Sequence, residues 1–245
     1  MKYIYGLNKS GNSIINYLRK INENFCCWDD NQDIRKKIKG KYTNINFINP
    51  KNLDLKKVEE AFISPGIDFK NKNLNIFRAS KIPLYRDLEL YSRVTKNFKI
   101  IAITGTNGKS TTSKLISDVL KKNYLKNFLE GNIGIPLLDF YKFKNAKDYH
   151  IVELSSFQLE SFISFRPYIS ILLNISKDHL ERYKSFNDYA IQKKKIFKSS
   201  IKNYKIICID DNFTRKIYNS NKNSFIPISK NIIKNGISFK DNLII

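Results

Sequence analysis

The chain has 245 residues, of which 42% are hydrophobic and 13% aromatic, which is enough for two modest globular domains. Its formal net charge of +22 comes from lysines spread along the whole sequence, and this even spread disfavours a nucleic-acid partner while favouring anionic substrates. No segment approaches 18 uninterrupted apolar residues, and the first residues lack the apolar region of a signal peptide, so we expect no membrane segment and a cytoplasmic location.

The first third of the sequence alternates strand-like and helix-like segments. A glycine-bearing loop at residues 6–11 follows the first strand, and the second strand ends at Asp29 and Asp30. This order is typical of a Rossmann-like unit. The turn Ser-Pro-Gly-Ile at residues 64–67 follows another strand, at the end where open α/β sheets bind ligands. The predicted strands cover residues 2–5, 24–28, 44–48 and 58–63, and the predicted helices cover residues 13–20 and 86–95.

A polar connector at residues 96–99 marks a predicted domain boundary, with residues 1–95 in the first domain and 96–245 in the second. The second region repeats the β–α alternation with apolar strands, which favours a mostly parallel sheet covered on both faces. We therefore predict an α/β protein. The strands expected here cover residues 100–104, 149–154, 168–174 and 204–209, and the helices cover residues 109–122, 156–163 and 186–198.

Residues 100–112 read IIAITGTNGKSTT, which is the strand, glycine turn and helix start of a phosphate-binding loop. Lys109 can reach the β- and γ-phosphates of a nucleotide, and the Ser110 hydroxyl can bind Mg²⁺. The amino end of the helix adds positive charge at the same place. The match is partial, because the usual first glycine is replaced by Ile103. The following helix is expected to bury one apolar side, formed by Leu115, Ile116, Val119 and Leu120.

Two further strands of the second domain end in polar groups. Glu153 is a candidate Mg²⁺ ligand, because an acidic residue at the end of a neighbouring strand often holds this ion. Ser155 or Ser156 could instead cap the segment that follows. His179 follows the next strand and is a better candidate for a metal or phosphate role than His150, for which a structural role is expected. We expect these strand ends to converge with the phosphate-binding loop on one crevice.

Taken together, four strings resemble the Mur ligases, the ATP-dependent amino-acid-adding enzymes of peptidoglycan precursor synthesis. They are ITGTNGKST at residues 103–111, GNIG at 131–134, ELSSFQLE at 153–160 and NISKDHLERY at 174–183. The third string is similar to the branch of the family that adds D-glutamate. The resemblance spans nearly the whole chain, and the strings arrive in the family's order. It implies a Rossmann-like UDP-substrate-binding domain at residues 1–95 and a P-loop ATPase-type domain at residues 96–245.

The resemblance also implies roles for single residues in binding ATP and Mg²⁺. The catalytic residues implied are Lys109, Glu153, His179 and Lys193. Lys193, four residues after a tyrosine, stands where the family carries a carbamylated lysine that supports Mg²⁺. The implied Mg²⁺ ligands are Ser110, Glu153, His179 and Lys193. The implied ATP-binding residues are Gly105, Thr106, Asn107, Gly108, Lys109, Ser110 and Thr111.

The implied substrates are UDP-N-acetylmuramoyl-L-alanine and D-glutamate. Asn132, Ser155 and Ser156 would lie toward the muramoyl group, and Ser10 and Asp29 would contact the UDP part. In the family, a C-terminal domain follows the central one, so we expect the second domain to be incomplete at its C-terminus. Alternatives are a non-catalytic fragment, a split enzyme with a separate C-terminal domain chain, or another Mur-type ligase.

Overall fold

The computed structural model describes residues 1–142, 147–179, 181–198, 203–240 and 243–244. The chain forms two compact units. The first comprises Met1–Val94, Pro136–Lys144 and Glu160–Ser164, and the second comprises Thr95–Ile135, Asn145–Leu159 and Phe165–Ile245. Within the described residues, no helix is long and apolar enough to cross a membrane.

The first unit is built around a parallel sheet with the strand order β2-β1-β3-β4. Its strands and α-helices are β1 (Lys2–Tyr5), α1 (Lys9–Lys20), β2 (Phe25–Trp28), α2 (Gln32–Lys41), β3 (Glu60–Ile63), α3 (Asn75–Ala79), β4 (Leu84–Tyr85) and α4 (Asp87–Val94). Short 3-10 helices cover Pro50–Asn52, Leu55–Lys57, Lys72–Leu74 and Leu137–Lys142. The chain leaves β1 for β2 on one side and later returns to β3 on the other, so the carboxyl end of β1 is a topological switch point.

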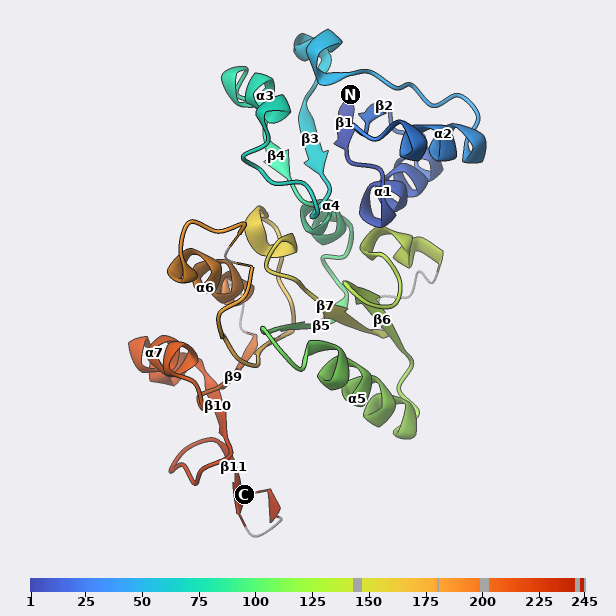
Figure 1. Cartoon of the computed structure of the whole chain (residues 1–245). Helices are drawn as coiled ribbons and strands as arrows, with labels where there is room; N and C mark the ends of the chain where they lie inside the picture. Colours follow the sequence, from blue (N-terminus) through green and yellow to red (C-terminus); the bar gives the residue numbers. More distant parts are fainter. Residues whose placement is uncertain (143–146, 180, 199–202, 241–242, 245) are drawn as a thin grey trace. The chain divides into compact units, whose positions relative to one another are not determined.

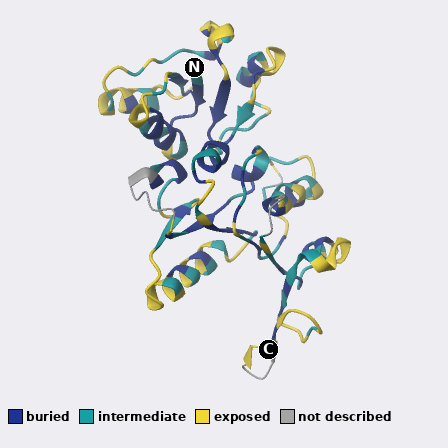
Figure 2. Cartoon of the chain, turned by 180° about the vertical axis from the view of Figure 1, so that it is seen from behind, coloured by how far each residue is buried: buried dark blue, intermediate teal, exposed yellow. Residues whose placement is uncertain are grey.

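The core of the first unit lies on β1, β2 and β3, where Figure 2 shows buried residues in dark blue. Tyr3 and Phe77 are fully buried, and their rings pack with centroids 5.1 Å apart. On α1, the predicted inward residues Ile14, Ile15 and Leu18 are all buried, which confirms the helical periodicity expected there. This burial fixes the position of the loop between β1 and α1.

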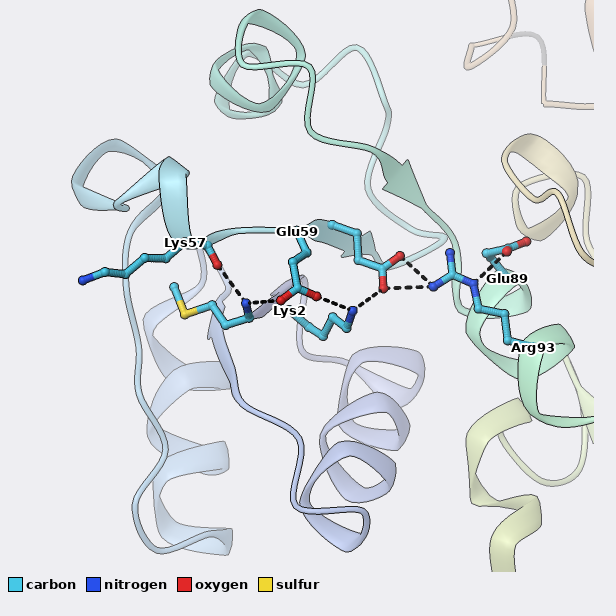
Figure 3. A network of polar contacts seen from close by, with 7 residues as sticks. Lys2, Lys57, Glu59, Glu89 and Arg93 are labelled. Carbon is cyan, nitrogen blue, oxygen red and sulfur yellow. Dashed lines mark hydrogen bonds and ion pairs between the residues drawn. The ribbon is translucent and has the colours of Figure 1, made fainter.

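A network of charges links the amino ends of β1 and β3 to α4 (Figure 3). Lys2 bonds the carboxylates of Glu59 and Glu60, and Arg93 bonds Glu60 in turn. Arg93 also pairs with Glu89, a buried residue whose carboxylate accepts the backbone N–H groups of residues 163 and 164 at 2.6 and 2.9 Å. Glu89 therefore fastens the 160–164 segment to α4 within the first unit.

The second unit contains a sheet of eight strands among the described residues, in the order β12-β11-β10-β9-β8-β5-β7-β6. Its elements are β5 (Lys99–Thr104), α5 (Lys109–Lys122), β6 (Asn127–Gly131), β7 (Tyr149–Glu153), β8 (Ile169–Leu172), α6 (Phe186–Lys194), β9 (Tyr204–Cys208), α7 (Asn212–Ser220), β10 (Ile226–Ser229), β11 (Ile237–Lys240) and β12 (Leu243–Ile244). Every pairing is parallel except that of β11 with β12. The predicted α/β class with mostly parallel sheets is confirmed (Figure 1).

Helix α5 packs on this sheet with only two of the four residues predicted to face it. Ile116 and Leu120 contact the buried isoleucines of β5, β7 and β8, whereas Leu115 and Val119 are 63% and 51% exposed. The prediction of a four-residue apolar side was wrong because serines occupy half of the buried face. The positions i, i+3, i+4 and i+7 that turn inward are Ser113, Ile116, Ser117 and Leu120.

Two predicted elements are absent from the described structure. Residues 44–48 form only an isolated bridge between Phe47 and Cys27, because Asn44 adopts a φ of 58° and Pro50 follows closely. The helix predicted over residues 156–163 is reduced to a 3-10 turn at Gln158–Glu160. Conversely, the sequence analysis predicted none of α2, α3, α7, β4, β6, β10, β11 and β12, which the structure contains.

Candidate active site

The phosphate-binding loop of the second unit joins β5 to α5. Strand β5 lies between β7 and β8, so the carboxyl ends of three parallel strands share one edge. Gly108 ends the loop with a φ of 79°, a conformation that favours glycine, and no side chain caps α5. At Gly105, a Cβ would lie 2.9 Å from the Cβ of Leu173, too close for any other residue. The amino end of α5 is thus open toward an anion.

Lys109 lies at the first position of α5, and its side chain folds back over the loop. Its Nζ donates to the carbonyl oxygens of Gly105 and Thr106 at 2.9 and 2.7 Å. Ser110 and Thr111 follow on the exposed side of the same turn. The structure therefore brings together the loop residues that the sequence selected for ATP.

Glu153 ends β7 and is fully buried. Its Oε1 accepts a hydrogen bond of 2.8 Å from the Nδ2 of Asn132, which also donates its backbone N–H to the Glu153 carbonyl. Among the described residues, nothing donates a hydrogen bond to its Oε2. A buried carboxylate oxygen without a donor is costly, and a cation would satisfy it. The geometry of Glu153 thus fits a divalent cation, and Asn132 positions the carboxylate.

Lys193 lies on α6 and is only 2% exposed, which is rare for a lysine. Its Nζ donates to the carbonyl oxygen of Gly105 at 2.7 Å and lies 4.9 Å from the centre of the Tyr189 ring. Burial, and after it the positive charge of Lys109, lower the pKa of Lys193 to about 7 against the opposing effect of the Asp178 and Glu153 carboxylates. An amine in this state is neutral in a substantial fraction of molecules at neutral pH.

His179 occupies a less enclosed position than Glu153. Its φ is 52°, its side chain is 41% exposed, and its ring lies 4.8 Å from that of Phe157. Its two ring nitrogens are each 3.4 Å from a carboxylate, of Asp178 and of Glu181. In the part of the chain that the structure describes, no three His, Cys, Asp or Glu side chains gather as a metal site. The metal-binding roles of Ser110, Glu153, His179 and Lys193 stay predictions.

The two serines after β7 differ in their surroundings. The Ser155 hydroxyl accepts the backbone N–H of Gln158 at 3.2 Å, which is the capping role considered for it. Ser156 is buried, and its hydroxyl has no hydrogen-bond partner among the described residues. His150 is fully buried with its Nδ1 2.6 Å from Glu130, a structural setting.

A cavity of about 680 Å³ lies at the carboxyl ends of β1, β2 and β3 in the first unit. Ser10, at the amino end of α1, and Asp29, after β2, both line it. Asp29 uses both carboxylate oxygens within the protein, accepting the backbone N–H groups of Leu7 and Asn31 at 2.7 and 2.9 Å. Asp29 thus shapes the rim, while its neighbour Asp30 also lines the cavity.

The turn around this cavity depends on close backbone packing. A Cβ on Gly11 would lie 1.9 Å from the carbonyl oxygen of Gly6, so only glycine fits. The same carbonyl accepts the Ser64 hydroxyl at 2.7 Å, which joins the first loop to the turn at residues 64–67. The structure therefore places the first-domain residues selected from the sequence around one cavity at the switch point.

Sequence reasoning missed residues that act on the loop from other elements. Asn174 bonds the backbone of Asn107, and the Tyr189 hydroxyl lies 3.0 Å from that of Thr106. A signal was present for Asn174, because it follows an apolar strand and begins the NISKDHLERY string. Its partner, however, is 67 residues away in the sequence.

Comparison with known proteins places this geometry in a family. A family model for the Mur ligase middle domain matches residues 103–242. A UDP-N-acetylmuramoylalanine–D-glutamate ligase of Rickettsia prowazekii is 39% identical, over 98% of this chain and 55% of that protein. One of the same name from Wolbachia pipientis wMel is 36% identical, over 92% of this chain and 44% of that protein. The chain thus spans about half the length of the curated relatives it matches.

A solved structure shares the fold at low sequence identity. It is the UDP-N-acetylmuramate:L-alanyl-gamma-D-glutamyl-meso-diaminopimelate ligase of Neisseria meningitides, with a TM-score of 0.62 and 12% identity. The alignment covers 97% of this chain and 79% of that one. The family match and the fold agree with the glycine loop, the buried acid and the buried lysine at one sheet edge. The chain belongs to the Mur ligase family.

Proposed function

We propose that the chain supplies the ATP- and UDP-substrate-binding parts of a ligase that joins D-glutamate to UDP-N-acetylmuramoyl-L-alanine in peptidoglycan precursor synthesis. Residues 1–95 would bind the UDP-substrate and residues 96–245 would bind ATP. The observation that carries this proposal is the glycine loop flanked by the buried Glu153 and Lys193. The names of the Rickettsia and Wolbachia relatives support the choice of D-glutamate as the added amino acid.

The proposed reaction has two steps. The L-alanine carboxylate attacks the γ-phosphorus of ATP, breaking its bond to the β–γ bridging oxygen and giving an acyl phosphate and ADP. The D-glutamate amine then attacks the acyl carbon, loses a proton and releases inorganic phosphate as the amide forms. Lys109 and the amino end of α5 would hold the phosphates throughout. Glu153 and Ser110 would hold Mg²⁺, which, when bound, offsets the negative charge of the phosphates.

Lys193 would serve this site as a carbamate. A neutral amine adds CO₂ and releases a proton, and the lowered pKa of Lys193 makes the neutral form accessible near pH 7. The product is an anion at a buried position beside the loop. Such an anion would favour a cation near Glu153 and relieve the repulsion between Lys193 and Lys109.

The UDP part of the substrate would occupy the first-unit cavity. Ser10 and the amino end of α1 suit a diphosphate, and the Asp30 carboxylate, held by Tyr5 and Trp28, lies at the rim. The chain spans about half the length of its relatives. A second candidate function is therefore a non-catalytic one, in which the chain binds ATP and the UDP-substrate without turnover.

Calorimetry and turnover together test the proposal. We expect UDP-N-acetylmuramoyl-L-alanine and MgATP each to bind the purified chain with one-to-one stoichiometry. With the C-terminal half of the Rickettsia prowazekii relative added as a separate polypeptide, we expect ADP release that requires both the UDP-substrate and D-glutamate. Binding without turnover favours the second candidate, and well-folded protein that binds neither ligand would contradict both.

A further inference from the structure

Residues 174–176, which follow β8, hydrogen-bond the phosphate-binding loop at residues 106 and 107, and we call this contact the clasp. The side chain of Asn174 makes two hydrogen bonds to one residue of the loop. Its Oδ1 accepts the backbone N–H of Asn107 at 2.8 Å, and its Nδ2 donates to the Asn107 carbonyl at 3.0 Å. The Asn174 carbonyl also accepts the backbone N–H of Thr106 at 2.9 Å. One residue thus fixes three successive peptide units of the loop, between residues 105 and 108.

The segment at residues 174–176 is itself anchored to the turn after β9, the strand next to β8. The backbone N–H of Ile175 donates to Asp211 at 3.1 Å, and the other carboxylate oxygen of Asp211 caps α7 by accepting the N–H groups of Phe213 and Thr214 at 2.8 Å. The N–H of Ser176 donates to the Thr106 hydroxyl at 3.0 Å. The residue next to Asn174 is therefore fixed to the cap of α7, outside the phosphate-binding loop.

Asparagine suits this double hydrogen bond to the loop backbone better than aspartate or alanine does. Its side-chain amide presents an acceptor oxygen and a donor NH₂ group, which complement the N–H and C=O of one loop residue, Asn107. Aspartate keeps the acceptor but lacks the donor, and alanine lacks both. The clasp also decides which loop N–H groups are available, because those of Thr106 and Asn107 are committed to Asn174. The N–H groups from Gly108 onward then remain to face a phosphate.

We propose that Asn174 is a positioning residue for nucleotide phosphate binding, which holds residues 106 and 107 so that the amino end of α5 stays open to the anion. The inference rests on the proposed function, because it presupposes that the loop binds ATP. Holding the loop in advance removes an ordering cost from binding. The effect is therefore expected on ligands that carry phosphates and not on the nucleoside alone.

The test compares Asn174→Ala with Ser176→Ala by calorimetry. Ser176→Ala is the matched control, because it removes only an exposed hydroxyl and keeps the backbone contact to Thr106. For Asn174→Ala we expect MgATP affinity to fall about 10-fold or more, from the loss of two hydrogen bonds. Affinity for adenosine and for UDP-N-acetylmuramoyl-L-alanine should stay within about twofold. Amide exchange at residues 105–108 should accelerate in Asn174→Ala alone.

Three outcomes would overturn the inference. If wild type binds MgATP and Asn174→Ala binds it equally well, the role of Asn174 is refuted and the proposed function stands. If wild type binds no nucleotide, both fail together. If Asn174→Ala loses adenosine, ATP and UDP-substrate affinity alike, the residue has only a general structural role. Unchanged thermal unfolding of the variant would accompany the expected result.

Discussion

Replacing Lys193 by methionine should change the pH dependence of stability in a direction that the structure dictates. Methionine fills a similar volume without a charge, so the variant removes a buried amine from the region beside the loop. Lys193 is 2% exposed, and its folded-state pKa is about 7 against an ordinary 10.5. Between these two values the unfolded chain binds more protons than the folded one, so stability rises with pH.

The magnitude follows from the size of the pKa change. At about 1.36 kcal/mol per pH unit, protonated Lys193 costs the folded state about 5 kcal/mol at or below pH 7. This cost falls as the pH rises toward 10.5. The free energy of unfolding of wild type relative to Lys193→Met should therefore increase by about 2 to 3 kcal/mol between pH 7 and pH 9.

Urea unfolding followed by circular dichroism, in buffer freed of CO₂, measures this difference at each pH. Lys194→Met is the matched control, because Lys194 is exposed on the same helix and should give a flat difference. A flat difference for Lys193→Met as well would refute the argument that Lys193 is buried and displaced in pKa. In bicarbonate, carbamylation of the wild type should remove the pH dependence and add the mass of one CO₂.

Two further pairs of variants probe the first unit. Gly11→Ala places a Cβ 1.9 Å from the Gly6 carbonyl oxygen, so we expect a loss of about 3 kcal/mol or more and weaker binding of the UDP-substrate. In Gly40→Ala, on α2, the new Cβ would meet no atom outside its own helix within 4 Å, so this variant should be stabilised by up to about 1 kcal/mol. If urea unfolding found Gly11→Ala more stable than Gly40→Ala, the close packing around Gly11 would be contradicted. Glu89→Gln should lower the free energy of unfolding by about 3 kcal/mol, because Arg93 and the buried N–H groups lose their anionic partner. Glu59→Gln, at a site that is 62% exposed, should change the free energy of unfolding little. Burial opposes ionisation of Glu89, but these hydrogen bonds outweigh burial and lower its pKa. The stability that ionised Glu89 contributes is therefore lost as the pH falls through its pKa in the folded state. Equal acid sensitivity of Glu89→Gln and wild type would refute this.

The local features of the site follow from short stretches of sequence. The glycine loop, the strand before it and the helix after it are encoded within residues 100–122, because each depends on local backbone preference and periodicity. Glu153 could be selected in the same way, from its place at the end of an apolar strand. The sequence also indicated the cavity of the first unit, because turns follow the carboxyl ends of its strands, where parallel sheets bind ligands.

Local pattern misjudged the elements whose burial depends on distant partners. Half of the inward face of α5 is serine, so hydropathy pointed to the wrong side. Residues 44–48 are apolar enough for a strand but meet only Cys27 as a bridge. In both cases the neighbouring surface decides which residues are buried, and that surface comes from other parts of the chain.

The chemistry of the site is settled by tertiary contacts. The pKa of Lys193 is low because α6 buries its amine beside Gly105, 88 residues earlier, and near the charge of Lys109. The Glu153 oxygen that has no donor among the described residues lies near the loop, and Asn174 bonds the loop, because parallel β5, β7 and β8 end at one edge. A sequence lists the groups in order along the chain, whereas desolvation and hydrogen bonding depend on which groups meet in space. The sequence alone therefore identifies the residue types of the site, whereas their protonation and hydrogen-bond partners are determined by the tertiary structure.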